Sequence, residues 1–253
     1  MFNDLQKANL LKRVAALVLD IILLVVLTTG VGMVLSAVLD YDKYSQGLSQ
    51  YQEAYETQYQ VSFDVTQEEY AAMTEQQRQL LNEAYAQFSQ DPEAAYYYNM
   101  VINMSLLIVS LAVLLAYLGL EFGVPLFLGN GQTVGKKVFG LAVIRQNGVQ
   151  INAVTLFIRT LLGKYTFETM IPLILGMMIL WGAMGLTGVV VIFGIGILQI
   201  VLMVTSRTNA TIHDKLAQTV VVDLQSQRIF ANESEMLAYK ARLHEEKVKK
   251  QPY

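Results

Sequence analysis

The 253-residue sequence contains no cysteine, only two histidines and few charged residues. The absence of cysteine excludes disulfide bonds, thiolate metal sites and cysteine nucleophiles. His213 and His244 are too few for a histidine-rich metal site, and no pattern suggests a nucleophile beside a general base. The sequence therefore predicts a non-enzymatic protein without catalytic, cofactor-binding or metal-binding residues.

Charge is scarce, and it is unevenly distributed along the chain. Charged residues make up 15% of the sequence, against about 25% in a typical soluble domain. Hydrophobic residues make up 54%, and the mean hydropathy is +0.39. Because long windows contain almost no charge, we expect a multi-pass membrane protein whose main partner is the lipid bilayer, with no nucleic-acid partner.

Apolar runs of about 20 residues are long enough to cross a bilayer as helices. Residues 14–39 form the first run, which we interpret as a retained signal anchor, and residues 99–120 form the second. Residues 169–206 contain no charge and are too long for one helix, so we expect two spans joined by a turn at 182–188. The prediction is a four-helix transmembrane bundle.

The basic residues predict the topology. Residues 40–98 contain two basic and eleven acidic residues, whereas the other sixteen basic residues lie near the two termini and in residues 129–168. By the positive-inside rule, both termini are cytoplasmic in a cell membrane, and residues 40–98 lie outside. We therefore divide the chain into the N-terminus with the first span (1–39), an extracytoplasmic helical insert (40–98), the rest of the membrane domain (99–225) and a charged cytoplasmic tail (226–253).

The insert carries two stripes of apolar and aromatic residues at helical spacing, which favour a helical hairpin that packs on itself. A capping box from Thr66 to Glu69 predicts one helix start, and Asp91 before Pro92 predicts another. The alternative is that the insert presents a surface to a partner protein or to peptidoglycan.

A small cytoplasmic β element is expected within an otherwise all-α membrane protein. Apolar segments flank Asn147 and Gly148, a pair that favours a tight hairpin turn with positive φ at both positions. Residues 217–225 are a further strand candidate because three valines follow one another there.

Three motifs occur in order along the chain. They are RVAALVLDIILL at 13–24, GNGQTVGKKVFGLAVI at 129–144 and TNATIHDKLAQTVVV at 208–222. Together they resemble the RDD family of bacterial membrane proteins, which is named for one arginine and two aspartates. The resemblance implies that Arg13, Asp20 and Asp214 are these residues. It also suggests transport, since some members of the family are reported to act in cation–proton antiport.

Asp20 lies seven residues after Arg13, so the two share one face of the first helix about 10 Å apart. An aspartate at the centre of a span costs about 3 kcal/mol on insertion scales, which the apolar neighbours offset, so its presence suggests a use. Asp20 could form a structural pair with a base, act as an ion or proton exchange site, or be protonated and inert. Arg13 is expected to reach the interface or bind an anionic partner rather than contact Asp20.

The glycine-rich loop after the second span does not fit a nucleotide-binding P-loop. Gly131 and Gly135 enclose only three residues, and Lys137 stands where Ser or Thr is required. We expect the glycines to permit a turn and a close backbone approach, with Lys136 and Lys137 facing lipid headgroups or an acidic partner.

Two further acidic residues have candidate partners. Glu121 lies near the inner boundary of the second span, where it could pair with Arg13 or Arg159. His213 and Asp214 point about 100° apart on a helix, so we do not expect a catalytic pair. Asp214 is expected to bind backbone amides or a basic residue near the sheet.

The sequence thus predicts transport or cation/proton exchange around Asp20. Arg13 and Asp214 would belong to its polar network, and Glu121, Lys136 and Arg159 would support it. Because four spans are few for a lone transporter, we expect a homo-oligomer or association with another membrane protein. The alternative is a non-enzymatic accessory or regulatory membrane subunit that binds a partner protein.

The absence of cysteine makes the topology directly testable with single-cysteine variants. We expect Gln58→Cys to react with a membrane-impermeant maleimide in intact cells, and Asn147→Cys to react only after permeabilisation, because the basic residues divide in this way. Preferential labelling of Asn147→Cys in intact cells would contradict the predicted orientation.

Overall fold

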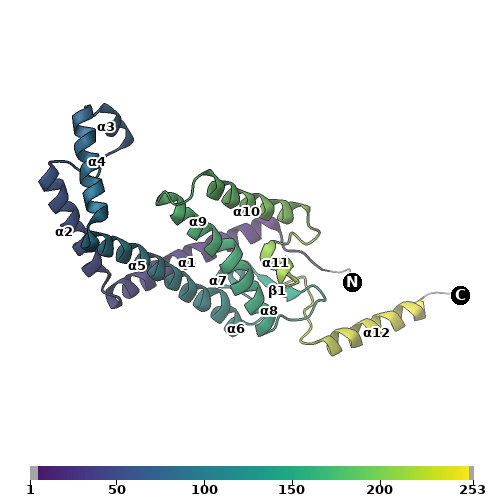
Figure 1. Ribbon diagram of the computed structural model, residues 1–253. Helices are drawn as coiled ribbons and strands as arrows, with labels where there is room; N and C mark the ends of the chain where they lie inside the picture. The colour runs from purple at the N-terminus through teal and green to yellow at the C-terminus, as the bar shows by residue number, and fades with distance from the viewer. Residues whose placement is uncertain (1–4, 251–253) are drawn as a thin grey trace. The chain divides into compact units, whose positions relative to one another are not determined.

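The structure is a computed structural model in which residues 5–250 are described (Figure 1). The predicted segments 1–39 and 226–253 therefore extend, at 1–4 and 251–253, outside the described residues. The chain forms two compact units. The first combines the residues up to Leu27 with those from Val113 onward, and the second is Thr28–Ala112.

Most of the described residues are helical, and two strands form a small sheet. In chain order the elements are α1 (Leu10–Val38), α2 (Tyr41–Tyr59), α3 (Gln67–Ala72), α4 (Glu75–Gln90), α5 (Pro92–Ala116), the π-helical η1 (Tyr117–Gly123), α6 (Val124–Leu128), α7 (Val134–Val138), β1 (Leu141–Arg145), α8 (Ala153–Phe157), the π-helical η2 (Ile158–Met170), α9 (Ile171–Leu180), α10 (Leu186–Thr205), α11 (Ile212–Leu216), β2 (Thr219–Asp223) and α12 (Glu233–Lys250).

Within the described part of the chain, three helical segments are long and apolar enough to cross a membrane. They are α1, the continuous helix Pro92–Leu128 made by α5, η1 and α6, and α10. The first two contain nearly all of the apolar runs at 14–39 and 99–120, which confirms that those runs are helical. The chain is accordingly a membrane protein with several apolar helices.

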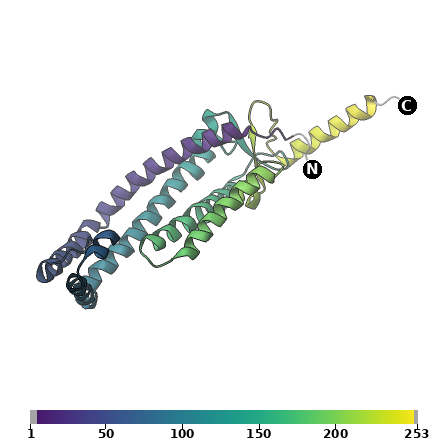
Figure 2. The same ribbon diagram turned by 90° about the horizontal axis from the view of Figure 1, so that it is seen from above.

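The fourth predicted span is not among these segments. α9 has ten residues, and it continues an unbroken helix that begins with α8 and η2. The part of that helix that precedes α9 carries Arg159, Lys164 and Glu168, so its apolar part is short. A turn at 181–185 leads from α9 into α10, and the two helices pack side by side (Figure 2). The turn lies close to the predicted 182–188, while the four-helix bundle stays a prediction.

The sheet pairs two strands that are far apart in the sequence. β1 and β2 are antiparallel, with Leu141 opposite Asp223 and Arg145 opposite Thr219. The predicted β-hairpin around Asn147 and Gly148 does not form, because the chain after the turn makes two isolated bridges, Ile144–Gln150 and Val149–Phe230, and then enters α8.

The turn itself also differs from the prediction. Gly148 has positive φ (90°), but Asn147 is not among the residues with positive φ, so the expected tight turn is wrong. Asn152 explains why no second strand follows. Its side chain accepts a hydrogen bond from the Thr155 backbone N–H at 2.8 Å, and this N-cap starts α8.

Both faces of the sheet are buried. One face packs against Ala8 and Ala16, the second of which lies in α1, and this contact fixes the start of α1 beside the sheet. The residues of that face are Leu141, Val143 and Val221, and those of the other are Ala142, Ile144, Val220 and Val222. The sheet therefore positions the beginning of α1 next to α11 and β2 within the first unit.

The second unit contains the predicted helical insert. The Thr66–Glu69 capping box is present, and Asp91 caps α5 by accepting from the Glu93 and Ala94 backbone N–H groups. A second capping box, from Thr74 to Gln77, begins α4, so the second of the two predicted stripes lies on two helices, α3 and α4.

Aromatic side chains hold the second unit together. The ring of Tyr55 on α2 meets Phe88 of α4 with centroids 5.7 Å apart. Tyr51 of α2 instead lies 5.7 Å from Tyr97 of α5, so the α2 stripe packs on two helices and not on α4 alone.

The close approach of η2 to α11 yields a prediction about stability. A Cβ added to Gly163 would lie 2.6 Å from the Cβ of His213, whereas one added to Gly176 would meet nothing within 4 Å. We expect Gly163→Ala to lose about 1–3 kcal/mol of stability through overpacking. Gly176→Ala should be neutral or stabilising, since alanine favours helices by about 1 kcal/mol. Thermal unfolding in detergent compares the two, and equal shifts would contradict the packing.

Candidate functional site

Charged side chains gather inside the first unit, beside the beginning of α1. Asp214 is fully buried, and Asp20, Glu121 and Arg159 are at most 6% exposed. An isolated buried charge is strongly unfavourable, so each of these groups requires a partner of opposite charge. The structure pairs all three acids with basic side chains. The ion pairs are Asp214 with Arg13 and Arg159, Asp20 with Lys136, and Glu121 with Lys164.

Asp214, in the short helix α11, joins three distant segments. Its Oδ1 accepts a hydrogen bond from Arg159 at 2.8 Å, and its Oδ2 accepts one from Arg13 at 3.1 Å. Thr211 donates its backbone N–H and its hydroxyl to Oδ2, at 3.2 and 2.8 Å. Burial alone would raise the pKa of Asp214, but the positive charge of Arg159 and its neighbours outweighs burial and holds this pKa well below the usual range. The carboxylate therefore stays ionised.

Asp20 binds the glycine-rich loop that follows the second span. The Thr133 hydroxyl donates to Oδ2 at 2.5 Å, and the Gly135 backbone N–H donates to Oδ1 at 2.7 Å. Lys136 places its Nζ 3.6 Å from Oδ2. A Cβ on Gly135 would lie 2.3 Å from the Ala16 carbonyl oxygen, so only glycine allows the loop to come this close to α1.

Of the two positions expected for Lys136, at lipid headgroups or at an acidic partner, the structure shows the second. Its side chain is 13% exposed and turns toward Asp20, whereas the neighbouring Lys137 is exposed. Arg13 does not pair with Asp20. Besides its ion pair with Asp214, Arg13 donates a hydrogen bond to the Asn209 carbonyl oxygen at 2.7 Å. The two aspartates named by the sequence motif thus belong to separate pairs inside one cluster.

Glu121 pairs with neither of the arginines suggested for it. It lies in η1 and accepts a hydrogen bond from the Nζ of Lys164 in η2. Thr160 ties the same two helices together by donating its hydroxyl to the Glu121 backbone carbonyl at 3.1 Å. Arg159 is instead committed to Asp214.

A histidine–glutamate pair completes the cluster. Glu168 accepts from the His213 backbone N–H at 3.0 Å, and one of its oxygens lies 2.8 Å from His213 Nδ1. Burial lowers the pKa of His213, although Asp214 and Glu168 oppose this effect, and the ring is therefore mainly neutral near pH 7. The Thr211 hydroxyl lies 3.0 Å from the other ring nitrogen.

Sequence reasoning missed Lys164, Glu168 and Thr133 as members of the cluster. Lys164 and Glu168 are four residues apart and share a face of an ordinary α-helix, but Arg159 precedes Lys164 by five residues and would point away from both. η2 is π-helical, and the Ile171 N–H that follows it bonds the carbonyl five residues earlier. The wider turn brings the three charges to one side. The sequence signal that could have indicated a π-helix was the five-residue spacing of Arg159 and Lys164 just before the uncharged residues 169–206.

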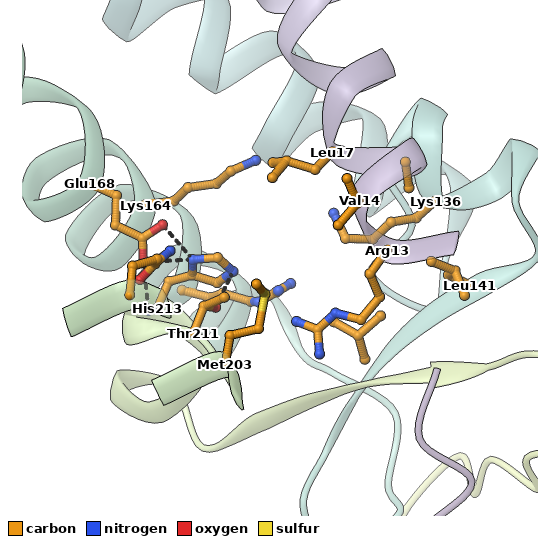
Figure 3. A pocket seen from close by; sticks show the side chains of 14 residues that line it. Arg13, Val14, Leu17, Lys136, Leu141, Lys164, Glu168, Met203, Thr211 and His213 are labelled. Carbon is orange, nitrogen blue, oxygen red and sulfur yellow. Dashed lines mark hydrogen bonds and ion pairs between the residues drawn. The ribbon is translucent and has the colours of Figure 1, made fainter. Parts of the chain in front are cut away.

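The cluster surrounds a cavity of about 120 Å³. Figure 3 shows the charged side chains of Arg13, Lys136 and Lys164 around it, with the hydrogen-bonded His213 and Glu168 on one side. Across the residues that the structure describes, no group of three or more histidine, aspartate or glutamate side chains is placed to hold a metal ion.

The fold and the cluster define a membrane protein whose apolar helices meet a buried network of ion pairs. The sequence model of the RDD family matches residues 7–218, which include Arg13, Asp20 and Asp214, and the chain belongs to the RDD family. A search of curated proteins and a search of solved structures each gave no match.

The contrast between buried and exposed ion pairs yields a stability prediction. Asp214→Asn leaves the two buried guanidinium groups without a charged partner and should cost about 3–5 kcal/mol. Asp223 forms an equally short pair with Lys12, 2.7 Å long, but both side chains reach solvent. Asp223→Asn should cost less than about 1 kcal/mol. Chemical unfolding in detergent measures both, and similar losses would show that Asp214 has no special structural role.

Proposed function

We propose that this protein exchanges a monovalent cation for a proton across the membrane at the Asp20–Lys136 pair, without enzymatic chemistry. The observation that carries the proposal is the buried amino group of Lys136, whose Nζ lies 3.6 Å from Asp20 and 3.1 Å from the Thr133 hydroxyl oxygen. Burial lowers the pKa of Lys136 to about 8, although Glu121 opposes this effect. The amino group can therefore release and regain a proton near physiological pH.

The chemistry follows from charge balance. When Lys136 loses its proton, the Asp20 carboxylate is left without its nearest positive charge. A cation that takes the place of the proton restores that charge, and it meets the oxygens of Asp20 and Thr133, which are ligands that hard cations prefer. One charge replaces one charge at a buried site, so the exchange is electroneutral.

The contacts of Asp20 suit this role. Its carboxylate oxygens accept hydrogen bonds from the Thr133 hydroxyl and the Gly135 backbone N–H, and the Lys136 amino group is the donor in neither of these bonds. The oxygens therefore stay in place while the lysine changes its protonation state. The other ion pairs of the cluster keep the surrounding charges neutralised during the exchange.

A second candidate role rests on the second unit. Four tyrosines there are more than a third exposed, and tyrosine is enriched in protein interfaces. These residues are Tyr70, Tyr85, Tyr96 and Tyr98. They favour an accessory or regulatory subunit that binds another membrane protein, or a second copy of this chain. This role makes no use of the protonation of Lys136.

Purified protein in liposomes tests the exchange. An imposed gradient of Na⁺, K⁺ or Li⁺ should move protons, with an activity that rises as the pH increases through about 8, because deprotonated Lys136 admits the cation. Lys136→Arg keeps the charge but cannot release a proton, so it should abolish proton movement, as should Asp20→Asn. Lys137→Arg is the matched control at an exposed position, and it should behave as wild type.

Two outcomes would contradict the proposal. One is cation-driven proton movement by Lys136→Arg at the wild-type rate. The other is the absence of cation-driven proton movement in correctly inserted wild-type protein, which would favour the accessory role.

Because the exchange is electroneutral, clamping the membrane potential with valinomycin and K⁺ should leave the rate of Na⁺-driven proton movement unchanged.

A further inference from the structure

The cavity in the polar cluster has an uneven charge. Four basic side chains from three parts of the first unit line it, namely Arg13, Lys136, Arg159 and Lys164. Among the described residues that line it, the acidic side chain is Glu168, which is engaged with His213. The carboxylates that neutralise the four bases lie in other positions of the cluster. Most of the cavity wall is apolar, and a charged solute that enters it meets the positive side of these ion pairs.

Arg159 supplies a second, independent observation. Its side chain is 7% exposed and bonds Asp214 through one terminal nitrogen, yet its buried Nε has no hydrogen-bond partner. A buried donor without a partner costs about 1–3 kcal/mol, and more when it is charged. Because Arg159 lines the cavity, a negatively charged acceptor there can satisfy this donor.

The size and the remaining lining limit the ligand. A bound water occupies about 10–15 Å³ on the scale used for cavities, so a cavity of about 120 Å³ admits a group much larger than water. Val14, Leu17 and Met203 add apolar side chains to its wall. Arginine and lysine together are the usual recognition elements for phosphate oxygens.

We propose that this cavity binds a phosphate group, through Arg13, the Nε of Arg159 and the amino groups of Lys136 and Lys164. The phosphate is supplied either by the headgroup of an anionic phospholipid or by free inorganic phosphate. The apolar part of the wall suits the glycerol end of a lipid, whereas free phosphate would use the basic side chains alone.

Phosphate binding in the cavity would change the pH dependence of the proposed cation–proton exchange. This consequence rests on the proposed function. The cluster holds four acids, Asp20, Glu121, Glu168 and Asp214, against the four bases that line the cavity. A bound anion adds negative charge beside Lys136 and favours its protonated form. Exchange should then begin at a higher pH in membranes that contain the anion.

Direct binding can be measured without any transport. The full-length protein in detergent is heated with short-chain phosphatidylglycerol, with inorganic phosphate or with short-chain phosphatidylcholine, each at matched concentration. A ligand present at about ten times its Kd should raise the unfolding temperature by about 3–5 °C. A shift with phosphatidylglycerol alone assigns the site to a lipid headgroup, and a shift with inorganic phosphate as well assigns it to the phosphate group itself.

Three variants locate the site. Arg159→Lys keeps the positive charge but removes the Nε donor, and it should lose the shift. Met203→Trp fills the cavity without altering any charge, and it should also lose the shift if Arg159→Lys fails to fold. Arg145→Lys makes the same change in a solvent-exposed pair with Glu233 and should keep the shift.

Other results would overturn the proposal. These are the absence of any shift, an equal shift with the zwitterionic phosphatidylcholine, or a wild-type shift in both Arg159→Lys and Met203→Trp. Asp20→Asn separates this proposal from the exchange, because Asp20 is not among the described residues that line the cavity. It should lose proton movement while retaining the ligand-induced shift. If wild-type protein shows no exchange, the binding result stands by itself.

Discussion

The pairing of the Asp214 carboxylate with the guanidinium groups of Arg13 and Arg159 is the interaction on which the first unit depends. It joins the beginning of α1 to η2 and to the segment that carries α11 and β2, over sequence separations of 201 and 55 residues. All three groups are buried, so removal of any one of them leaves an uncompensated charge in a medium of low polarity. The antiparallel sheet beside them holds two of these regions, the beginning of α1 and the segment with β2, through apolar contacts, and packing and charge support one arrangement there.

Local signals in the sequence were sufficient for many of the elements. The apolar runs predicted the first two spans because burial in lipid requires length and hydrophobicity, and both can be read directly from the chain. The capping box at Thr66 and the cap at Asp91 depend on neighbouring residues only, and both are present. The family motifs pointed to Arg13, Asp20 and Asp214, and the structure places all three in one buried cluster.

The partners of these residues could not be read from the sequence, because they depend on distant contacts and on the helix type. A pattern read at 3.6 residues per turn separates Arg159 from Lys164 and Glu168, whereas the π-helical turns of η2 bring the three together. The expected hairpin at Asn147 had a good local signal, but β1 pairs with a strand about 75 residues further along, and the N-cap at Asn152 ended the competing strand.

The distance in sequence between Arg13 and its carboxylate has a consequence for biosynthesis. At roughly 5–20 residues per second, the ribosome needs roughly 10–40 s to reach Asp214 after it has made Arg13. Throughout that interval Arg13 also lacks the carbonyl of Asn209, so its charge must remain in water or among lipid headgroups while the first helix is already in place. The first unit can close only when α11 arrives, and a nascent chain halted before that point carries two uncompensated arginines at the membrane.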